Sequence, residues 1–538
     1  MKSIIRALIV LLVGSLLASV ASPLLAQEAM ERSGMRPDAP QYAIRGPHPV
    51  GYRSVVIGEG TEDSLAIDMW YPALNPEGAT EEITYELDMG NPDWLAGEPA
   101  VAYGQALLDA PIDDSMGPYP LIVFSHGFSG SPEWRSTALE HYASHGFVVL
   151  APTHANEQDW MEIVSATVGR PFDIVQTLDY AEEITAPGGD FAGQIDMDNV
   201  AVVGHSTGGY TALAAGGAQF DMEAFTERCA AVSEDDPNSF LCMPLVGKEE
   251  QLAEGLGLES VPEGLWPSMG DPRVTAIVSF AGDSYLFDKA GLAKITVPMM
   301  AIGGTADTGT PYDWGVKPSY DFASSTQKAL VTFDGAEHMI GSNLCEDMPF
   351  LAKAPFYDFV CLDPVWDKAR ALDLTDHFTT AFLLDTLKGD TAAHAALAPE
   401  AVSFPGIEYQ AEGFDTAQAN EELVRRWLYH WDVAFGELEG FDELLADDFV
   451  SHNMPEGDRE AVIAGVAAYR EENPNTSFVI DNLQIAGDTA FLFDHLVAVP
   501  EGATDATEGE AVSPVFLTVL RFADGKLAER WLYVPMEP

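Results

Sequence analysis

Between about Tyr52 and Lys388, β-rich runs alternate with helix-length segments along the chain. The predicted strands are residues 53–58, 65–71, 120–126, 146–152, 199–204, 274–280, 297–304 and 328–333. The predicted helices are residues 133–145, 171–185, 206–217, 312–323 and 374–388. Alternation of this kind is typical of an α/β fold with a mainly parallel sheet, because a crossover helix must connect parallel strands. We expect one such domain at 45–390 of the 538 residues.

Residues 218–273 interrupt the alternation, and we expect them to form a cap-like insertion over the carboxyl edge of the sheet. The insertion contains Cys229 and Cys242, and a second close couple, Cys345 and Cys361, follows it. Four cysteines allow three pairings, and the spacing favours one disulfide within each couple. No spacing resembles a zinc site, so no metal and no other cofactor are expected.

The C-terminal part of the chain follows a different pattern. Residues 391–417 are rich in Ala, Glu and Pro, and they are predicted to be a linker. In 418–538, one predicted helix is followed by several strand-like runs, which indicates a separate α+β domain. The apolar face of that helix is expected to carry Leu423, Trp427, Trp431 and Ala434.

The first 27 residues read as a secretory signal peptide. Lys2 and Arg6 precede an apolar run, and small residues suited to cleavage follow at Ala21 and Ala26. An uncleaved membrane anchor is the alternative interpretation. No later segment is long and apolar enough to span a membrane, so we expect a periplasmic or secreted protein without a membrane span.

The formal net charge is -59, from 26 basic and 85 acidic residues. Such an excess of negative charge argues against nucleic acid or an anionic membrane as a partner. The acidity extends over both predicted domains and is not confined to a tail. Adaptation to a saline habitat and ordinary acidity of an exported protein both fit this composition.

The segment "VAVVGHSTGG" places the pattern G-x-S-x-G, residues 204–208, between a predicted strand and a predicted helix. In that context the pattern is typical of a nucleophilic serine on a sharp turn, where glycines leave room for the neighbouring backbone. Ser206 is therefore the candidate nucleophile. The alternative is a small residue that merely joins a strand to a helix.

A serine needs a base and an orienting acid to act as a nucleophile. His338, in "VTFDGAEHMIG", follows a predicted strand and is the candidate base, and Asp307, in "IGGTADTG", is the candidate acid. Their order after the serine is that of α/β hydrolases. Asp283 is the rival acid. The rival histidines are His126, His154 and His205, of which His126 and His205 are expected to be structural.

An oxyanion hole needs two backbone amides in fixed positions. The amide of Thr207 follows the candidate nucleophile, and the amide of Phe128, in "FSHGFSG", is the candidate for the second. A simple glycine turn is the alternative for this loop. Phe128 and Trp160 are also candidates for an apolar substrate pocket, although an aromatic side chain is more often plain packing.

Four segments, "GPHPVGYRSVVI", "LAIDMWYPA", "GPYPLIVFSHGFSGSPEWRSTALEHYASHGFVVLAPTH" and "GHSTGGYTA", together carry a resemblance. The chain resembles, over about 45–390, the α/β hydrolases that include platelet-activating-factor acetylhydrolase-like esterases and predicted dienelactone hydrolases. "HGF" and "SHGFVV" are also similar to segments of cutinase-like polyester hydrolases. The resemblance implies a carboxylic-ester hydrolase with Ser206, Asp307 and His338 as its triad. True dienelactone hydrolases use a cysteine where this chain has the serine.

Over 418–538, the segments "LLADDFVSHN", "REAVIAGVAAYREENPNTSFVIDNL" and "LRFADGKLAERWLYV" resemble the SnoaL-like branch of the nuclear-transport-factor-2-like fold. The resemblance implies helices against a curved sheet that encloses a pocket. Cyclases of this group commonly have an acid shortly after the tryptophan of the last strand, but Leu532 follows Trp531 here. His452, Asp494 and Trp531 are expected to face the pocket or to have structural roles.

These features favour an exported serine carboxylic-ester hydrolase that forms an acyl-enzyme with lipid, short-acyl or polyester-type esters. The second domain is expected to support homodimerisation or to bind a ligand. One alternative is a binding or assembly protein with a degenerate hydrolase domain. Another is a bifunctional esterase whose second domain has an isomerase-like site.

Overall fold

The computed structural model describes residues 34–535, except 35, 62, 91, 155–162, 234–237, 343, 454–455, 501 and 524. The predicted signal peptide and Trp160 therefore lie outside the described residues. The chain divides into two compact units. The first unit comprises Met1–Leu383 and Phe404–Gln410, and the second comprises Leu384–Ser403 and Ala411–Pro538.

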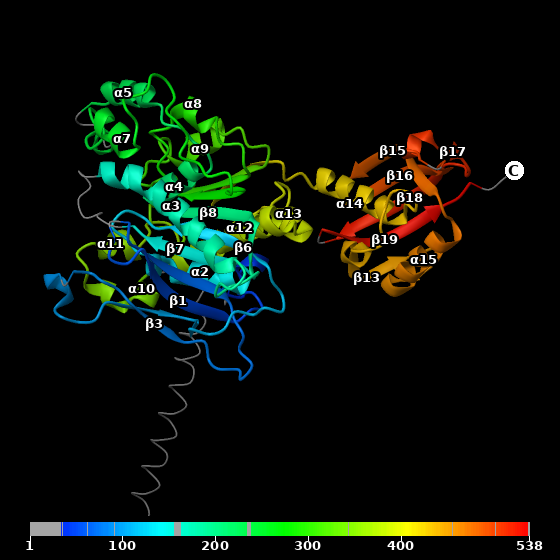
Figure 1. The fold of residues 1–538 in the computed structure, drawn as a ribbon, viewed down its shortest axis with the longest axis horizontal. Coiled ribbons are helices and arrows are strands. Elements are labelled where there is room, and N and C mark those ends of the chain that lie inside the picture. The colour runs from blue at the N-terminus through cyan, green and yellow to red at the C-terminus, as the bar shows by residue number, and fades with distance from the viewer. Residues whose placement is uncertain are drawn as a thin grey trace, which may run out of the picture. The chain divides into compact units, whose positions relative to one another are not determined.

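A 10-stranded sheet forms the centre of the first unit, with the order β12-β11-β10-β9-β8-β6-β7-β2-β1-β5 (Figure 1). Its strands are β1 (Val50–Ile57), β2 (Leu65–Pro72), β5 (Leu107–Leu108), β6 (Tyr119–Ser125), β7 (Val148–Thr153), β8 (Ile195–His205), β9 (Ala276–Phe280), β10 (Met299–Gly304), β11 (Lys328–Phe333) and β12 (Ile407–Glu412). The pairs from β7 through β6, β8, β9 and β10 to β11 are parallel, whereas β2 pairs antiparallel with both β1 and β7. The predicted α/β class with a mainly parallel sheet is confirmed.

Helices lie on both sides of this sheet (Figure 1). They are α2 (Ser136–Ser144), α3 (Ile163–Thr185), α4 (Thr207–Ala215), α5 (Met222–Ala231), α6 (Ser239–Cys242), α7 (Glu249–Gly255), α8 (Asp288–Leu292), α9 (Val316–Phe322), α10 (Leu344–Asp347), α11 (Tyr357–Cys361) and α12 (Lys368–Lys388), the last of which continues into the second unit. Side chains of α3, α4 and α9 share one buried apolar cluster with alternate residues of the central strands, such as Leu121 and Val123. Strand alternation thus supplies one layer of the core, and helix periodicity supplies the other.

Helix α3 begins at Ile163, eight residues before the predicted start at Pro171, which lies inside the helix. Proline has no amide hydrogen, so the carbonyl of Thr167 lacks its usual helical partner. The hydroxyl of Tyr210, in α4, donates to that carbonyl at 2.7 Å. A side chain from the neighbouring helix thus replaces the lost backbone bond and allows α3 to continue.

The predicted insertion at 218–273 contains α5, α6 and α7. Helix α7 packs against α3, and Figure 1 shows α5 and α7 close together. The predicted linker at 391–417 instead contains α13 (Thr391–Ala396) and the whole of β12. Asp390 caps α13 by accepting hydrogen bonds from the amides of Ala392 and Ala393, and the alanine-rich segment has a high helix propensity.

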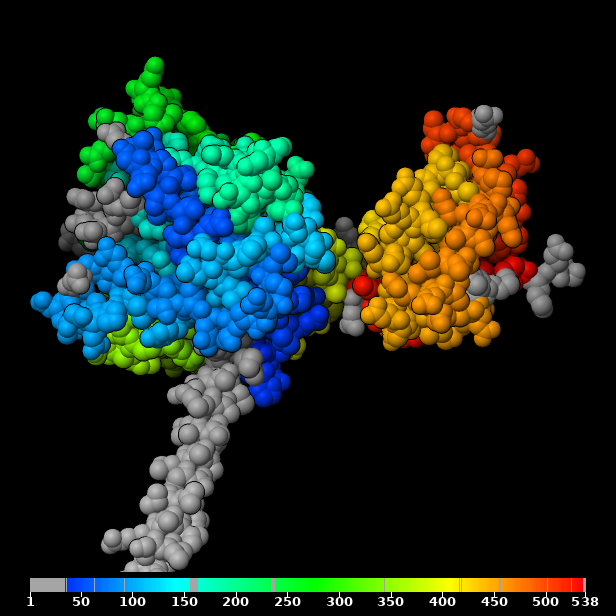
Figure 2. All heavy atoms as spheres, turned by 60° about the horizontal axis from the view of Figure 1, so that its bottom comes forward, coloured from blue at the N-terminus to red at the C-terminus, as the bar shows by residue number. Residues whose placement is uncertain are grey.

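Segments far apart in sequence meet on the surface of the first unit. The short sheet of β3 (Ile83–Glu86) and β4 (Val101–Gly104) flanks the 3-10 helix η2 (Asp93–Leu95). Trp94 of η2 stacks on Phe350 of η5 (Pro349–Lys353), with ring centroids 6.3 Å apart. Figure 2 shows the blue and yellow-green residues of these regions side by side.

The second unit is an α+β structure in which a 7-stranded sheet has the order β14-β13-β19-β18-β16-β15, with β17 paired to β16. Its elements are α13, α14 (Thr416–Trp431), α15 (Arg459–Glu472), β13 (Leu445–Ser451), β14 (Gly457–Asp458), β15 (Thr476–Ala486), β16 (Thr489–Ala498), β17 (Glu510–Ala511), β18 (Phe516–Ala523) and β19 (Lys526–Tyr533). Leu423, Trp427 and Trp431 of α14 are buried in one cluster with residues of α15 and the sheet.

The prediction for Ala434 was wrong, because α14 ends at Trp431. The carboxylate of Asp432 accepts hydrogen bonds from the amides of Ala434 and Phe435, both at 2.9 Å. Asp432 therefore turns the chain out of the helix, and Ala434 does not extend its apolar face.

Candidate active site

Ser206 lies in the turn between β8 and α4, with φ 59° and ψ -124°. This backbone conformation is rare for a residue with a side chain and is typical of a nucleophile elbow. A Cβ atom on Gly204 would lie 2.0 Å from the carbonyl oxygen of Gly208, and one on Gly208 would lie 1.9 Å from that of Ser125. Both positions must therefore be glycine for this turn to pack against the sheet.

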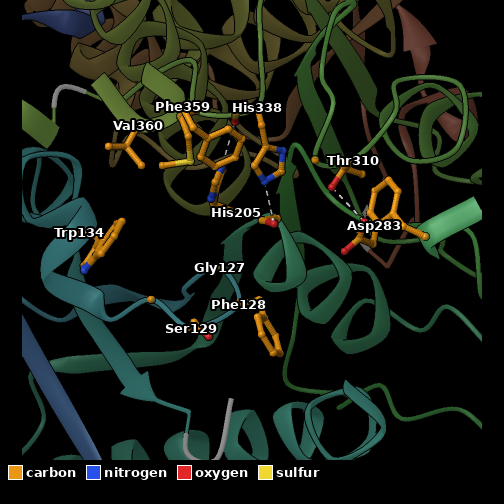
Figure 3. A pocket seen from close by; sticks show the side chains of 15 residues that line it. Gly127, Phe128, Ser129, Trp134, His205, Asp283, Thr310, His338, Phe359 and Val360 are labelled. Atoms are coloured by element: carbon orange, nitrogen blue, oxygen red, sulfur yellow. Dashed lines mark hydrogen bonds between the residues drawn. The ribbon is translucent and has the colours of Figure 1, made fainter. Parts of the chain in front are cut away.

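Two loops at the carboxyl ends of neighbouring parallel strands bring His338 and Asp307 to Ser206. Nε2 of His338 lies 2.9 Å from Oγ of Ser206, along the dashed line in Figure 3. Nδ1 of the same ring lies 2.9 Å from both carboxylate oxygens of Asp307. Asp307 follows β10 and His338 follows β11, so the parallel pairing of these strands sets the contact. The structure brings these three predicted residues together.

The carboxylate of Asp307 is held by its own loop. Its Oδ1 accepts hydrogen bonds from the amides of Gly309 and Thr310, at 2.8 and 2.7 Å. Asp283 instead accepts from the hydroxyl of Thr310 at 3.0 Å and lines the cavity beside Ser206. Burial raises the pKa of Asp283 to about 6. The imidazole of His338 is thus bonded to Asp307, and the rival carboxyl faces the cavity.

His205, next to Ser206, supports the candidate base. Its Nε2 lies 3.2 Å from the carbonyl oxygen of His338, and its ring packs against Phe280. Burial lowers the pKa of His205 well below its ordinary value, so the ring is neutral and its Nε2–H donates to that carbonyl. His205 therefore holds the backbone of His338, whereas the hydroxyl of Ser206 is bonded to the ring of His338.

The loop after β6 passes beside Ser206. A Cβ atom on Gly127 would lie 3.4 Å from Cβ of Ser206, and Phe128 lines the same cavity. Thr207 is buried as the first residue of α4. The backbone segments at Phe128 and Thr207 therefore lie near the candidate nucleophile, from two different elements.

A buried arginine fixes the carbonyl side of that loop. The guanidinium of Arg170, in α3, donates to the carbonyl oxygens of His126 and Gly127, the latter at 3.2 Å. Nδ1–H of His126 donates to the carbonyl of Gly127 at 2.7 Å. Sequence reasoning missed Arg170, because the arginine lies on a helix 44 residues after His126 and no local pattern marks it.

Beneath the loop, His154 links three elements. Its backbone amide donates to Nε2 of His126 at 3.0 Å, its Nε2 lies 2.9 Å from Oγ of Ser125, and its Nδ1 lies 2.7 Å from the carboxylate of Asp173. Burial lowers the pKa of His154 well below its ordinary value and raises that of Asp173 to about 6. Ser125 is fully buried, so this second serine–histidine–aspartate arrangement supports the loop from inside the fold.

A cavity of about 370 Å³ opens beside Ser206 and His338 (Figure 3). Four aromatic side chains form much of its wall: Phe128, Trp134, Phe240 and Phe359. The ring of Phe359 stacks on that of His338, with centroids 5.9 Å apart. Sequence reasoning identified only Phe128 among these four, because the other three come from separate helical segments.

Two disulfides lie close to this wall in sequence. Cys229 is paired with Cys242, and Cys345 is paired with Cys361. The predicted pairing within each couple is confirmed. Phe240 lies in the short helix α6 that ends at Cys242, and Phe359 lies in α11, which ends at Cys361. Each disulfide therefore restrains a segment that lines the cavity.

In the second unit, Asp494 lines a separate cavity, whereas His452 and Trp531 do not. The ring of His452 stacks on that of Trp531, with centroids 4.4 Å apart. Nε2 of His452 lies 2.6 Å from the carboxylate of Glu529. These two predicted pocket residues thus have structural partners.

Within the part of the chain that the structure describes, no helix has the length and apolar character needed to cross a bilayer. Residues 105–226 match the family model named Chlorophyllase, and residues 424–530 match the model of the SnoaL-like domain. The first match contains the turn at Ser206 and the loop at Phe128, and the second contains α15 and most of the 7-stranded sheet. The chain therefore combines a chlorophyllase-like α/β-hydrolase domain with a C-terminal SnoaL-like domain.

Proposed function

We propose that this protein is a serine hydrolase that cleaves carboxylic esters through Ser206, His338 and Asp307. The observation that carries the proposal is the single imidazole of His338, which lies 2.9 Å from the hydroxyl of Ser206 and 2.9 Å from the carboxylate of Asp307. In this arrangement a base can remove the serine proton while an anion stabilises the resulting imidazolium. The match to a hydrolase family model supports the same reaction class.

In the proposed reaction, Nε2 of His338 accepts the proton of Ser206 while Oγ attacks the ester carbonyl. The backbone amides of Phe128 and Thr207 donate to the oxyanion of the tetrahedral intermediate. Collapse of the intermediate breaks the bond to the alcohol, which leaves with the proton from His338. A water molecule, deprotonated by His338, then attacks the acyl-enzyme and releases the acid and the free serine.

The cavity wall supports apolar esters as substrates. Phe128, Trp134, Phe240 and Phe359 line the cavity beside Ser206, and aromatic surface of this kind favours burial of an apolar acyl or alcohol group. Asp283 is the carboxyl group in the wall, and a negatively charged ester would be repelled by it. Lipid, short-acyl and polyester-type esters all meet these conditions.

We propose further that the protein acts outside the cytoplasm. The two disulfides are compatible with an oxidising compartment. Fractionation of cells that produce the full chain, followed by detection in the periplasm and the medium, tests this proposal. Retention of the full-length protein in the cytoplasm would contradict it.

The replacement Ser206→Ala tests the proposed reaction. We expect the rate of hydrolysis of p-nitrophenyl esters to fall by about 10⁴- to 10⁶-fold, because no oxygen nucleophile remains. The matched control is Ser268→Ala, an exposed serine of the insertion, which we expect to retain full activity. A panel of acyl chain lengths with the unmodified protein then defines the preferred ester. Undiminished hydrolysis by the Ser206→Ala protein would overturn the proposal. If the unmodified protein also hydrolyses no ester of the panel, a binding protein is favoured.

A further inference from the structure

The wall of the cavity beside Ser206 contains one acidic side chain that the proposed reaction does not use. Among the described residues that line this cavity, Asp283 is the only aspartate or glutamate, and none is a lysine or an arginine. The residue is only 6% exposed. Burial lowers the pKa of His205 well below its ordinary value, so that ring adds no positive charge to the wall. The cavity is therefore electrostatically negative at Asp283.

Asp283 has a fixed position relative to the reacting groups. Thr310 connects two carboxyl groups: its amide donates to Oδ1 of Asp307 at 2.7 Å, and its hydroxyl donates to Oδ1 of Asp283 at 3.0 Å. Figure 3 shows Asp283 and Trp134 on opposite sides of His338. The carboxyl group of Asp283 thus lies toward one end of the cavity, and the indole lies toward the other.

The loop that carries Asp283 is held tightly. Ala281, directly after β9, has φ 46°, a left-handed conformation that is unfavourable for a residue with a side chain. A Cβ atom on Gly209, in α4, would lie 2.5 Å from Cα of Gly282, so the loop packs closely against the helix that follows the nucleophile. The carboxyl group is therefore preorganised, as a binding group must be.

One oxygen of this carboxyl group has no partner in the protein. Oδ1 of Asp283 accepts from Thr310, but no described residue donates a hydrogen bond to Oδ2. Burial raises the pKa of Asp283 to about 6, so the group is mainly ionised at pH 8. A buried carboxylate with an unused oxygen is unfavourable. A cation that enters the cavity would supply both an opposite charge and a hydrogen bond.

Two further features favour a cation over a neutral donor at this position. Phe128, Trp134, Phe240 and Phe359 line the same cavity, and the faces of aromatic rings attract positively charged groups. The net charge of the chain is -59, so its electrostatic potential favours the approach of a cationic substrate. A positive charge on an otherwise apolar ester matches both the carboxylate and the aromatic wall.

We propose that Asp283 forms a subsite for a primary ammonium group, and that the preferred substrates are apolar esters with such a group at one end. This inference rests on the proposed esterase reaction and names the class of ester on which it acts. The ammonium N–H groups donate to Oδ2 of Asp283, the alkyl chain packs along the aromatic wall, and the ester carbonyl lies at Ser206. Asp283 binds the substrate and takes no part in proton transfer.

Two pairs of esters test the proposal, and the members of each pair differ only in a terminal ammonium or methyl group. In p-nitrophenyl 6-aminohexanoate and p-nitrophenyl heptanoate this group is on the acyl side, and in 6-aminohexyl acetate and heptyl acetate it is on the alcohol side. At pH 8 we expect kcat/KM to be about 10- to 100-fold higher for the ammonium ester in at least one pair, the range for a hydrogen bond to a charged group. Equal values within both pairs would overturn the proposal.

The replacement Asp283→Asn keeps the shape of the side chain and removes its charge. It should raise KM for the preferred ammonium ester, and so lower its preference over the methyl ester by about 10-fold or more, because a binding contact far from the reacting bond is lost. The matched control is Asp313→Asn, which removes a charge at an exposed position and should keep the preference. Thermal unfolding verifies that both variants are folded. A preference that survives in the Asp283→Asn protein would overturn the proposal.

Binding of hexylammonium distinguishes failure of this inference from failure of the proposed function. Calorimetric titration requires no turnover, and we expect the Kd to be about 10-fold or more lower for the unmodified protein than for the Asp283→Asn protein. If no ester is hydrolysed, the proposed function fails, but this difference in Kd would still support the ammonium subsite. Absence of binding, or equal Kd values, would overturn the subsite even if all four esters are hydrolysed.

Discussion

The two cavities of this protein are both aromatic and both contain a buried carboxyl group, but their polar atoms are used differently. Beside Ser206, the carboxylate of Asp307 is bonded to His338 and to two backbone amides of its own loop. In the second unit, Oδ1 of Asp494 has no partner within the described residues. A carboxylate saturated by the protein is held in a fixed geometry, whereas an unsaturated buried one carries an uncompensated desolvation cost.

The strongest test of this difference replaces two carboxyl groups one at a time: Asp307, which is bonded to His338, and Asp283, which lines the first cavity. Asp307→Asn should lower kcat for p-nitrophenyl esters by about 10³- to 10⁴-fold, because the amide fails to stabilise the imidazolium of His338. Asp283→Asn is the matched control and should change kcat by less than about 10-fold, since it removes no bond to His338. A larger loss in the Asp283→Asn protein would reverse the assignment of the acid.

A smaller effect is expected at Arg170, which holds the loop without contacting the reacting atoms. Arg170→Met should lower kcat by about 10- to 100-fold with little change in KM, because the carbonyls of His126 and Gly127 lose their donor and the amide of Phe128 shifts. Arg170→Lys keeps the charge and should restore part of the loss. Steady-state kinetics and thermal unfolding separate this positioning role from a general loss of stability.

An unchanged kcat in the Arg170→Met protein would contradict the positioning role. A rise in KM without a fall in kcat would also contradict it, because that result indicates a contact with the bound substrate.

The smallest effect concerns the pH dependence of stability in the second unit. The pKa of Asp494 is about 7 in the folded chain because of burial, compared with about 4 in an unfolded chain. The folded state therefore takes up a proton as the pH falls from about 7 to about 4, and stability rises over that range. The amide of Asn cannot ionise, so the Asp494→Asn protein carries no buried charge at this position at pH 8. The replacement should therefore raise the thermal midpoint by a few degrees at pH 8 and by less at pH 5.

Thermal unfolding of the unmodified chain and the Asp494→Asn protein at both pH values measures this difference. Asp488→Asn, at an exposed position, serves as the control and should give the same small change at each pH. A difference that is equal at pH 5 and pH 8 would show that Asp494 has an ordinary pKa.

Local sequence patterns predicted eight of the ten strands of the first sheet and missed β5 and β12. The predicted strand at 328–333 coincides with β11, and G-x-S-x-G lies at the predicted strand-to-helix turn. These features depend on residues within a few positions of one another, so they are visible in sequence. Helix α3 was predicted too short, because the effect of Pro171 is compensated by Tyr210 from another helix, which no local pattern reveals.

The cavity wall shows the same limit. Trp134, Phe240 and Phe359 meet beside Ser206 only because the tertiary fold brings three distant segments together. Two of these residues lie two positions before a disulfide-bonded cysteine, at Cys242 and Cys361. An aromatic residue two positions before a disulfide-bonded cysteine is therefore the sequence pattern that marks these two wall residues.

The two disulfides have a consequence for the shape of the cavity beside Ser206. Ser206, His338 and Asp307 lie on loops of the sheet that contain no cysteine, so no disulfide crosslinks these loops directly. The segments with Phe240 and Phe359, in contrast, each end at a disulfide. Reduction of the two disulfides would thus release two segments of the cavity wall without breaking a covalent link to the candidate nucleophile. The oxidation state of the cysteines therefore bears on the shape of the cavity.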